Sequence, residues 1–237
     1  MTDAFIVTCE HGGNRIPAPY RPLFASHAAL LATHRGYDPG ALQMARALAV
    51  ALHAPLVTAT VSRLLVDLNR SIGHPRLHFE ATRELAAQTR AQIVARHYRP
   101  YRARVELLVA RAVARRRRVI HISSHSFTPE LDGKVRRADL GLLYDPGREG
   151  ELALSARWKA ALAALAPALR VRRNYPYAGK GDGLTSHLRL RFPARAYVGI
   201  ELEVNQKIVL EGGRPWAALR AALIDSLGAA CDRSGQI

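Results

Sequence analysis

The sequence predicts an α/β fold in which helices wrap a mostly parallel sheet. Strand-like and helix-like segments alternate from one end of the chain to the other, which is typical of such folds. The 237 residues are enough for one large α/β domain with a buried core, and 49% of them are hydrophobic, which excludes a disordered chain. Pro and Gly cluster between the elements rather than forming a linker. We therefore expect a single domain over residues 1–237.

Six short segments have the composition of strands. The first is the apolar run Phe5-Ile6-Val7-Thr8-Cys9, and a similar run, Val119–Ser123, lies in the middle of the chain. Apolar runs of this length are consistent with strands that are buried on both faces of a sheet. The predicted strands cover residues 4–9, 56–61, 118–123, 140–144, 169–173 and 196–204.

Four longer segments between and after these strands predict helices. One begins at Asp38 and runs to His53, with Asp38 expected as the N-cap and Pro39 at the first helical position. A long helical stretch follows at residues 83–116, where Pro100 is expected to break or kink the helix. The other two helices are expected at residues 149–165 and 215–227.

The chain is strongly basic, with 35 Lys and Arg against 19 Asp and Glu and a formal net charge of +16. Such a balance, with the run Arg115–Arg118, is compatible with a nucleic-acid partner. However, aromatic residues are few and do not alternate with the basic runs, so the stacking platforms of single-strand binders are not evident. Solvated arginines on helix faces are the favoured interpretation, and their positive field would also attract a small dianionic substrate.

Cysteine content and hydropathy bear on the environment of the protein. The two cysteines, Cys9 and Cys231, imply no disulfide framework, and Cys9 is expected to be a buried apolar residue of the first strand. No export signal and no run of about 18 apolar residues is evident in the sequence. We therefore expect a soluble, cytoplasmic protein.

Two histidines follow predicted buried strands and are the strongest functional signal. His11 lies in Glu10-His11-Gly12-Gly13-Asn14 after the first strand, and His125 lies in Ser123-Ser124-His125-Ser126 after the third. In open α/β folds the carboxyl ends of the strands form the edge where ligands bind. Two imidazoles at this edge predict a hydrolytic zinc centre, although either histidine could instead be a hydrogen-bonded loop residue.

Carboxylates complete this predicted centre. Asp38 is the candidate third ligand, although an Asp before a helix is also an ordinary N-cap. Glu201 and Glu203 share one face of an otherwise apolar strand, where two buried carboxylates are costly unless they have partners or a role. Either of them could be the general base of a zinc hydrolase, and a solvated edge strand is the alternative.

The segment from Ser62 to Ser71 adds arginines that could recognise a carboxylate. Arg63 and Arg70 carry planar guanidinium groups that bind carboxylates through two parallel hydrogen bonds. Asp67 could orient either of them. A purely structural Arg–Asp pair is an equally good interpretation of these residues alone.

Taken together, these segments resemble the N-formylglutamate amidohydrolase family. The resemblance covers about residues 4–210 in consistent order, and no single motif would be sufficient. The matching segments are Glu10–Asn14, the helix start Asp38-Pro39-Gly40-Ala41, Ser62–Arg70, Ser123–Pro129, Asn174–Gly179 and Glu203-Val204-Asn205.

The resemblance implies a three-layer α/β/α sandwich with a mixed, mostly parallel sheet, like that of zinc peptidases and of the phosphorylase/hydrolase fold. It implies hydrolysis of an N-formyl or N-acyl amino acid, N-formyl-L-glutamate being the usual substrate in histidine catabolism. The chain is similar, more distantly, to aspartoacylases and to peptidoglycan amidases. A cell-wall amidase or another N-acyl hydrolase on the same zinc centre is therefore the second enzyme hypothesis, and a basic nucleic-acid-binding protein is the non-enzyme one.

Residue roles carried over from the family follow the matching positions. His11, Asp38 and His125 become ligands of Zn²⁺ or another divalent metal, and Glu203 becomes the general base that takes a proton from water and returns it to the leaving amine. Glu201 stays an alternative base, because the pair makes the assignment ambiguous. Asn69 and Arg70 become substrate contacts. The loop from Tyr175 to Gly183 is expected to close over the substrate, with Arg63 and Tyr177 as further contacts.

Overall fold

The fold is built around a six-stranded mixed sheet. The computed structural model describes residues 3–231. The strands lie in the order β2-β1-β3-β8-β6-β7, and only the β6–β8 pair is antiparallel. This arrangement confirms the predicted mixed, mostly parallel sheet. The strand bounds are β1 (Asp3–Cys9), β2 (Leu56–Thr58), β3 (Arg118–Phe127), β6 (Leu140–Leu143), β7 (Val171–Arg173) and β8 (Tyr197–Asn205).

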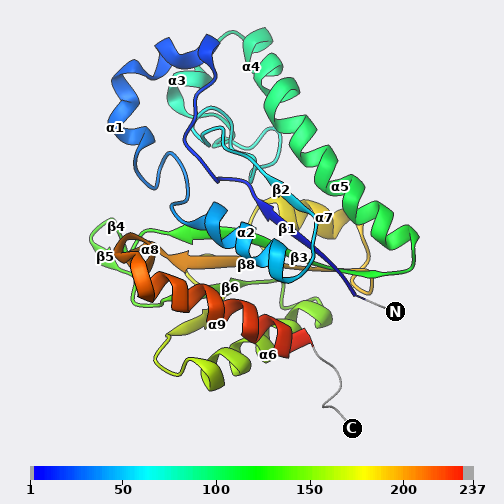
Figure 1. Cartoon of the computed structure of the whole chain (residues 1–237). Helices are drawn as coiled ribbons and strands as arrows, with labels where there is room; N and C mark the ends of the chain where they lie inside the picture. Colours follow the sequence, from blue (N-terminus) through cyan, green and yellow to red (C-terminus); the bar gives the residue numbers. More distant parts are fainter. Residues whose placement is uncertain (1–2, 232–237) are drawn as a thin grey trace.

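Helices cover both faces of the sheet, so the fold has three layers (Figure 1). On one face, α2 (Ala41–Ala51), α6 (Glu149–Leu165) and α9 (Gly213–Cys231) bury apolar side chains such as Met44, Trp158 and Leu223 against the strands. The other face is packed by α5 (Arg99–Ala114) and α7 (Leu184–Arg191). No helix within residues 3–231 is long and apolar enough to cross a membrane.

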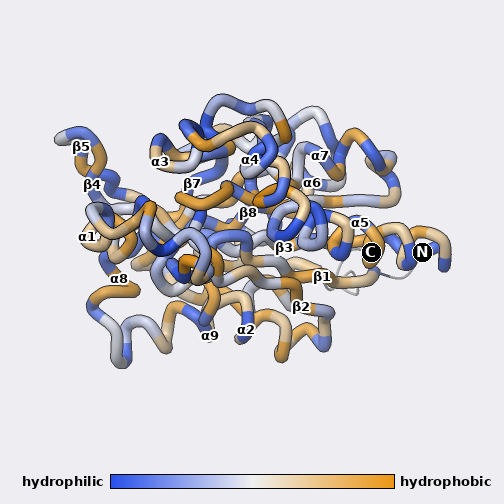
Figure 2. The backbone as a smooth tube through the Cα atoms, turned by 90° about the horizontal axis from the view of Figure 1, so that it is seen from above, coloured by the Kyte–Doolittle hydropathy of each residue, from blue (hydrophilic) through white to orange (hydrophobic). Residues whose placement is uncertain are grey.

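Shorter elements surround these layers. Two of them, α4 (Ala87–Ile93) and η2 (Val94–Tyr98), lie within the helical stretch predicted at residues 83–116. The sequence patterns did not predict the others, which are too short to show a clear hydrophobic period. The hairpin of β4 and β5 projects from one end of the molecule (Figure 2). The shorter elements are η1 (Ala18–His27), α1 (Ala28–Leu31), α3 (Glu80–Arg83), α4 (Ala87–Ile93), η2 (Val94–Tyr98), β4 (Glu130–Leu131), β5 (Lys134–Val135) and α8 (Gln206–Glu211).

The helix around Pro100 is continuous rather than broken. The α-helix α4 passes into the π-helical segment η2 and then into α5, whose second residue is Pro100. Proline has no N–H and its ring collides with the carbonyl four residues before it, so an ordinary α-helical turn cannot be kept there. The wider π turn accommodates Pro100 without ending the helix.

The start of α2 differs from the prediction. The helix begins at Ala41, its N-cap is Gly40 with φ of 79°, and Asp38 makes no side-chain capping bond. The backbone carbonyl of Asp38 accepts the N–H of Ala41, which closes the turn. A side chain at position 40 would also meet Val209 at 2.6 Å. The glycine therefore makes the turn, and the Asp38 carboxylate is free to contact other groups.

Candidate metal centre and substrate pocket

Parallel strands bring the predicted site residues to one edge of the sheet. His11 lies two residues after the end of β1, and β3 carries His125 near its end. Glu203 on β8 is the register partner of His125, and Glu201 is the partner of Ser123. Because the strands β1, β3 and β8 are neighbours in the sheet, residues from three distant parts of the sequence lie together.

His11, Asp38 and His125 form a compact, buried cluster. One ligand atom from each of them lies within 4.8 Å of the other two. The Asp38 Oδ2 atom is 3.3 Å from His11 Nδ1 and 2.9 Å from His125 Nδ1. Two imidazole nitrogens and a carboxylate oxygen that converge in this way are the donor set of a divalent metal site with a place left open. These three residues fit such an ion.

The second nitrogen of each imidazole is held by a carboxylate. His11 Nε2 lies 2.7 Å from Asp67 Oδ1, and His125 Nε2 lies 3.0 Å from Glu10 Oε2. Histidines that bind metals commonly donate their other N–H in this way, which fixes the tautomer and the ring orientation. Both Nδ1 atoms are thereby turned toward Asp38.

The charges around the cluster favour a bound cation. Burial alone would raise the pKa of Asp38, but His11, His125 and Arg63 hold it well below its ordinary value. Although burial lowers it, hydrogen bonds to Asp38 and Glu10 raise the pKa of His125 well above its ordinary value. The buried carboxylates outnumber the one arginine that contacts them, so a divalent ion would balance the cluster.

Glu10 is a site residue that the sequence patterns did not identify. Its side chain is fully buried and accepts hydrogen bonds from Tyr101 at 2.7 Å and from Ser123 at 2.6 Å, besides contacting His125. Burial would raise the pKa of Glu10, but the hydrogen bonds, first from His125, hold it well below its ordinary value. Its position at the end of an apolar strand could have indicated a site residue, because the same feature indicated Glu201 and Glu203.

Replacing Glu10 should weaken metal binding without touching a ligand. In the wild type the Glu10 carboxylate accepts the Nε2–H of His125. In Glu10→Gln an amide N–H can face this imidazole N–H instead, so we expect zinc affinity to fall about 10–100-fold. Competition with a chelator of known affinity measures this change. Tyr101→Phe removes a supporting hydroxyl but keeps the carboxylate, and it should have a much smaller effect. Unchanged zinc affinity in Glu10→Gln would show that Glu10 does not orient His125.

Glu203 and Glu201 lie in different environments. The Oε2 atom of Glu203 is buried and has no hydrogen-bond partner among the described residues, and burial raises the pKa of this carboxyl to about 8. Glu201 is engaged, because its Oε1 accepts a hydrogen bond from Thr185 at 2.5 Å. The free, proton-holding carboxyl beside the cluster is therefore that of Glu203.

A cavity of about 460 Å³ opens at the cluster. Arg63 is already paired with Asp67 at 2.8 Å and with Asp38 at 3.3 Å. Arg70 donates through one terminal nitrogen to backbone carbonyls, while its buried Nε has no partner in the part of the chain described. Of these two arginines, Arg63 is neutralised by two carboxylates, whereas Arg70 forms no ion pair among the described residues and keeps more of its N–H donors for a ligand. The lining includes His11, Asp38, His125, Glu201 and Glu203, and the four predicted substrate contacts Arg63, Asn69, Arg70 and Tyr177.

The remaining predicted contacts are held by their neighbours. Asn69 accepts the backbone N–H of Leu184 at the start of α7, at 2.6 Å. Tyr177 accepts a hydrogen bond from Arg136 at 3.1 Å, and the Arg136 guanidinium lies 5.2 Å from the centre of the Tyr177 ring. Arg136 follows the hairpin β4–β5, so it connects the hairpin to the loop after β7. No motif marked this residue, because its partner is 41 positions away.

A cluster of two histidines and a carboxylate at the open edge of an α/β sheet, with an unpaired glutamate beside it, is typical of hydrolases that activate water at a metal. The match to known families narrows this class. The model of the N-formylglutamate amidohydrolase family matches residues 3–210. The chain belongs to this family, and the predicted family is confirmed.

Solved structures show the same fold. A gene product of Agrobacterium tumefaciens is 31% identical, with a TM-score of 0.82 over 95% of this chain and 89% of that chain. The N-formylglutamate amidohydrolase of Ralstonia eutropha is 20% identical, with a TM-score of 0.70 over 96% of this chain and 93% of that one. A comparison with curated proteins gives no match.

Proposed function

We propose that the chain is a zinc-dependent amidohydrolase that hydrolyses N-formyl-L-glutamate to formate and L-glutamate. A closely related N-acyl amino acid would give the carboxylic acid of its acyl group and the free amino acid. The observation that carries this proposal is the buried cluster of His11, Asp38 and His125 beside the unpaired carboxyl of Glu203. Family membership supports the amide chemistry. The arginines of the cavity support an anionic substrate.

His11, Asp38 and His125 would hold the metal. A zinc ion there would supply the Lewis acidity that activates water and polarises the amide carbonyl. Glu10 and Asp67 keep the two imidazoles oriented toward it. Zinc is preferred to harder cations because two imidazole nitrogens contribute to the donor set.

Glu203 moves the proton. Its carboxylate accepts a proton from the attacking water, and the resulting acid donates that proton to the nitrogen of the leaving amine. In the metal-free protein burial raises the pKa of Glu203 to about 8. A dication held by the neighbouring cluster would lower this pKa and favour the carboxylate, which is the form that accepts a proton. The absence of a hydrogen-bond partner for Oε2 within the described residues leaves that oxygen available to the reacting groups.

Arg70 holds a carboxylate of the substrate through its unpaired donors. We expect Arg70→Lys to raise KM for N-formyl-L-glutamate by about tenfold or more. The lysine ammonium cannot form the two parallel hydrogen bonds that a guanidinium forms with a carboxylate, and losing one charged hydrogen bond costs roughly 1.5–3 kcal/mol. Steady-state kinetics measure the change in KM separately from kcat. The control is Arg195→Lys at an exposed position away from the cavity, which should leave KM unchanged. A normal KM in Arg70→Lys would remove Arg70 from substrate binding.

The test of the function is a substrate screen with zinc-loaded protein. N-formyl-L-glutamate, N-formyl-L-aspartate, N-formyl-L-leucine and N-acetyl-L-glutamate separate the preference for the acyl group from that for the side chain. We expect the highest kcat/KM for N-formyl-L-glutamate and a large loss for the leucine compound. Equal rates on acidic and neutral substrates would refute the assigned specificity. Hydrolysis of none of them would refute the proposed function.

A further inference from the structure

The strands β6 and β8 separate at a point where two charged side chains continue their ladder. The register of the two strands ends with Leu143 opposite Glu201. Gly199, two residues earlier on β8, lies just beyond this pair. Its N–H is accepted by Glu151 at 3.2 Å, and its carbonyl accepts a hydrogen bond from Arg189 at 3.1 Å. Because buried backbone groups must be paired, these two side chains take the place that a residue of β6 would have.

Glu151 and Arg189 form a buried ion pair that joins helices α6 and α7. The Nη2 atom of Arg189 lies 2.9 Å from Glu151 Oε2, and its Nε donates to Glu151 Oε1 at 3.0 Å. The Glu151 side chain is fully buried, and that of Arg189 is 6% exposed. Charges at this depth are costly unless they are paired and hydrogen-bonded. Glu151 also accepts the N–H of Asp145 at 2.7 Å, so the pair is attached to the chain that leaves β6.

The Arg189 guanidinium also reaches the loop after β7. Its Nη1 atom donates to the carbonyl of Gly179 at 2.5 Å and to Ser186 Oγ at 3.2 Å. The loop lies tight against the chain here, because a Cβ atom at Gly179 would come within 2.1 Å of the backbone nitrogen of Tyr144. Ser186 donates in turn to the carbonyl of Gly181 at 2.6 Å. Helix α7 thus holds the loop by two of its carbonyls.

The loop that α7 holds is a wall of the substrate cavity. Tyr177, Ala178, Gly181 and Asp182 line that cavity. The carbonyl of Asp182 accepts a hydrogen bond from Arg70 at 2.6 Å. Arg70 is the arginine assigned to the substrate carboxylate, so the position of the loop determines where its guanidinium lies.

We propose that Arg189 is a positioning residue for the amide hydrolysis, which ties residues 179–182 to the strand that carries Glu203 and thereby keeps Arg70 in place for the substrate. This inference rests on the proposed function, which assigns Arg70 to substrate binding. A guanidinium suits the task because its N–H donors spread in one plane, and those of Arg189 serve partners on α6, α7, β8 and the loop. The N–H groups of a lysine ammonium start from a single atom and cannot span the same partners.

The variant Arg189→Lys keeps the positive charge opposite Glu151 but loses the hydrogen bonds to the loop. We expect KM to rise about fivefold or more while kcat changes less than about threefold, since the loop positions a binding group and not the base. Steady-state kinetics on the best substrate of the screen separate the two constants. Zinc affinity, measured by chelator competition, should stay at the wild-type value, because the partners of Arg189 in the described chain do not include a residue of the metal cluster.

Arg148→Lys is the matched control. Arg148 is paired with the same Glu151, at 3.4 Å. It donates to the carbonyls of Arg189, Phe192 and Tyr197, and none of these partners within the described residues lies in the loop. A purely structural role of the buried pair predicts equal changes in both variants, whereas we expect KM of Arg148→Lys to stay within about twofold of the wild type. An equal rise of KM in the two variants, or a normal KM in Arg189→Lys, would overturn the proposal.

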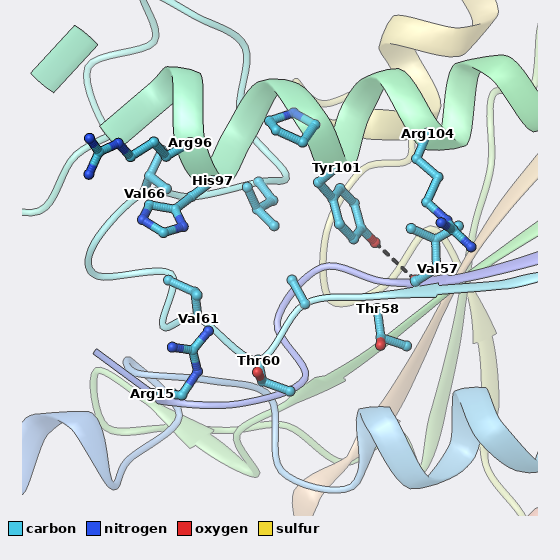
Figure 3. Close-up of a pocket in the computed structure, with 13 residues that line it drawn as sticks. Arg15, Val57, Thr58, Thr60, Val61, Val66, Arg96, His97, Tyr101 and Arg104 are labelled. Carbon is cyan, nitrogen blue, oxygen red and sulfur yellow. Dashed lines mark hydrogen bonds between the residues drawn. The ribbon is translucent and has the colours of Figure 1, made fainter. Parts of the chain in front are cut away.

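Arg104→Lys makes the same chemical change at an exposed position. Arg104 lies beside Val57 in the wall of a separate cavity of about 350 Å³, which shares no described lining residue with the substrate cavity (Figure 3). Both kinetic constants should equal those of the wild type, so this variant gives the baseline for a change of arginine to lysine.

Hydrogen exchange tests the anchoring without a substrate. Deuterium uptake at residues 177–183 should be faster in Arg189→Lys than in the wild type and in Arg148→Lys, and unchanged uptake would overturn the proposal. If no substrate of the screen is hydrolysed, the proposed function fails, whereas the uptake still decides whether Arg189 anchors the loop. If Arg189→Lys does not fold, Ser186→Ala takes its place, because it removes the hydrogen bond to Gly181 and leaves the buried pair intact. It should show the same changes at a smaller size, and a normal KM with normal uptake there would equally overturn the proposal.

Discussion

Glu203→Gln should lose hydrolysis by about 10²–10⁴-fold while it keeps a full complement of zinc. The amide has nearly the shape of the carboxyl group but can neither accept a proton from water nor return it to the amine. The metal ligands are untouched, since His11, Asp38 and His125 hold one another independently of Glu203. Rates on N-formyl-L-glutamate and zinc content by mass spectrometry measure the two properties separately.

The matched control for this variant is Glu201→Gln, two residues earlier on the same face of β8. Glu201 already accepts a hydrogen bond from Thr185. We therefore expect the variant Glu201→Gln to retain much more activity than Glu203→Gln. An inactive Glu201→Gln together with an active Glu203→Gln would reverse the assignment of the base.

The substitution Glu203→Gln should also stabilise the metal-free protein at alkaline pH. The pKa of Glu203 is about 8 in the folded protein against an ordinary 4.5, so folding favours the neutral acid. The stability that this group contributes is fully present below pH 4.5 and is lost as the pH rises through 8. Since one pKa unit corresponds to about 1.4 kcal/mol, Glu203→Gln should gain a few kcal/mol at pH 9 and almost nothing at pH 4. Thermal unfolding with a chelator present measures this, and equal gains at both pH values would contradict it.

Asp38→Asn should lose both bound zinc and activity. The Oδ2 atom of Asp38 is the point on which both imidazole Nδ1 atoms converge, and an uncharged amide is a poor ligand for zinc. We expect zinc affinity to fall by several orders of magnitude and hydrolysis to fall to background. Chelator competition and the rate assay check these outcomes, and circular dichroism shows that the variant is folded.

Asp132→Asn is the control for this charge removal. Asp132 is exposed in the turn of the β4–β5 hairpin with φ of 50°, a conformation that Asn tolerates well. This variant should bind zinc and turn over substrate normally. Stoichiometric zinc in Asp38→Asn with normal turnover would remove Asp38 from the metal centre.

The sequence predicted the regular elements better than the exceptions to them. The helix at residues 149–165 was predicted with the bounds that α6 has, because its length makes the pattern clear. At Asp38 local rules point to a side-chain cap, which the structure does not show. At Pro100 they point to a break or a kink, and the helix passes through this residue without a break. Gly40, in the left-handed conformation, caps the helix after Asp38, and a π-helical segment precedes Pro100. Both depend on tertiary packing, which residue propensities do not describe.

The candidate site was visible where residues lie near the carboxyl ends of strands. His11, His125 and Glu203 could be brought together from the sequence alone, because the carboxyl ends of neighbouring parallel strands meet at one edge. The long-range contacts of other residues at the site, such as Glu10 and Tyr177, were not visible. Tyr101 reaches Glu10 across 91 positions, and Arg136 reaches Tyr177 across 41, so no local pattern connects them.

The register of β3 and β8 determines how the centre fails under stress. His125 and Glu203 are direct partners in the ladder, and β3 and β8 lie in the interior of the sheet. Amide protons in interior strands commonly exchange with solvent only when the whole molecule unfolds. Deuterium uptake at residues 123–127 and 200–204 should therefore be among the slowest in the chain, and mild denaturant should loosen the hairpin around Lys134 long before it separates the metal ligand from the base.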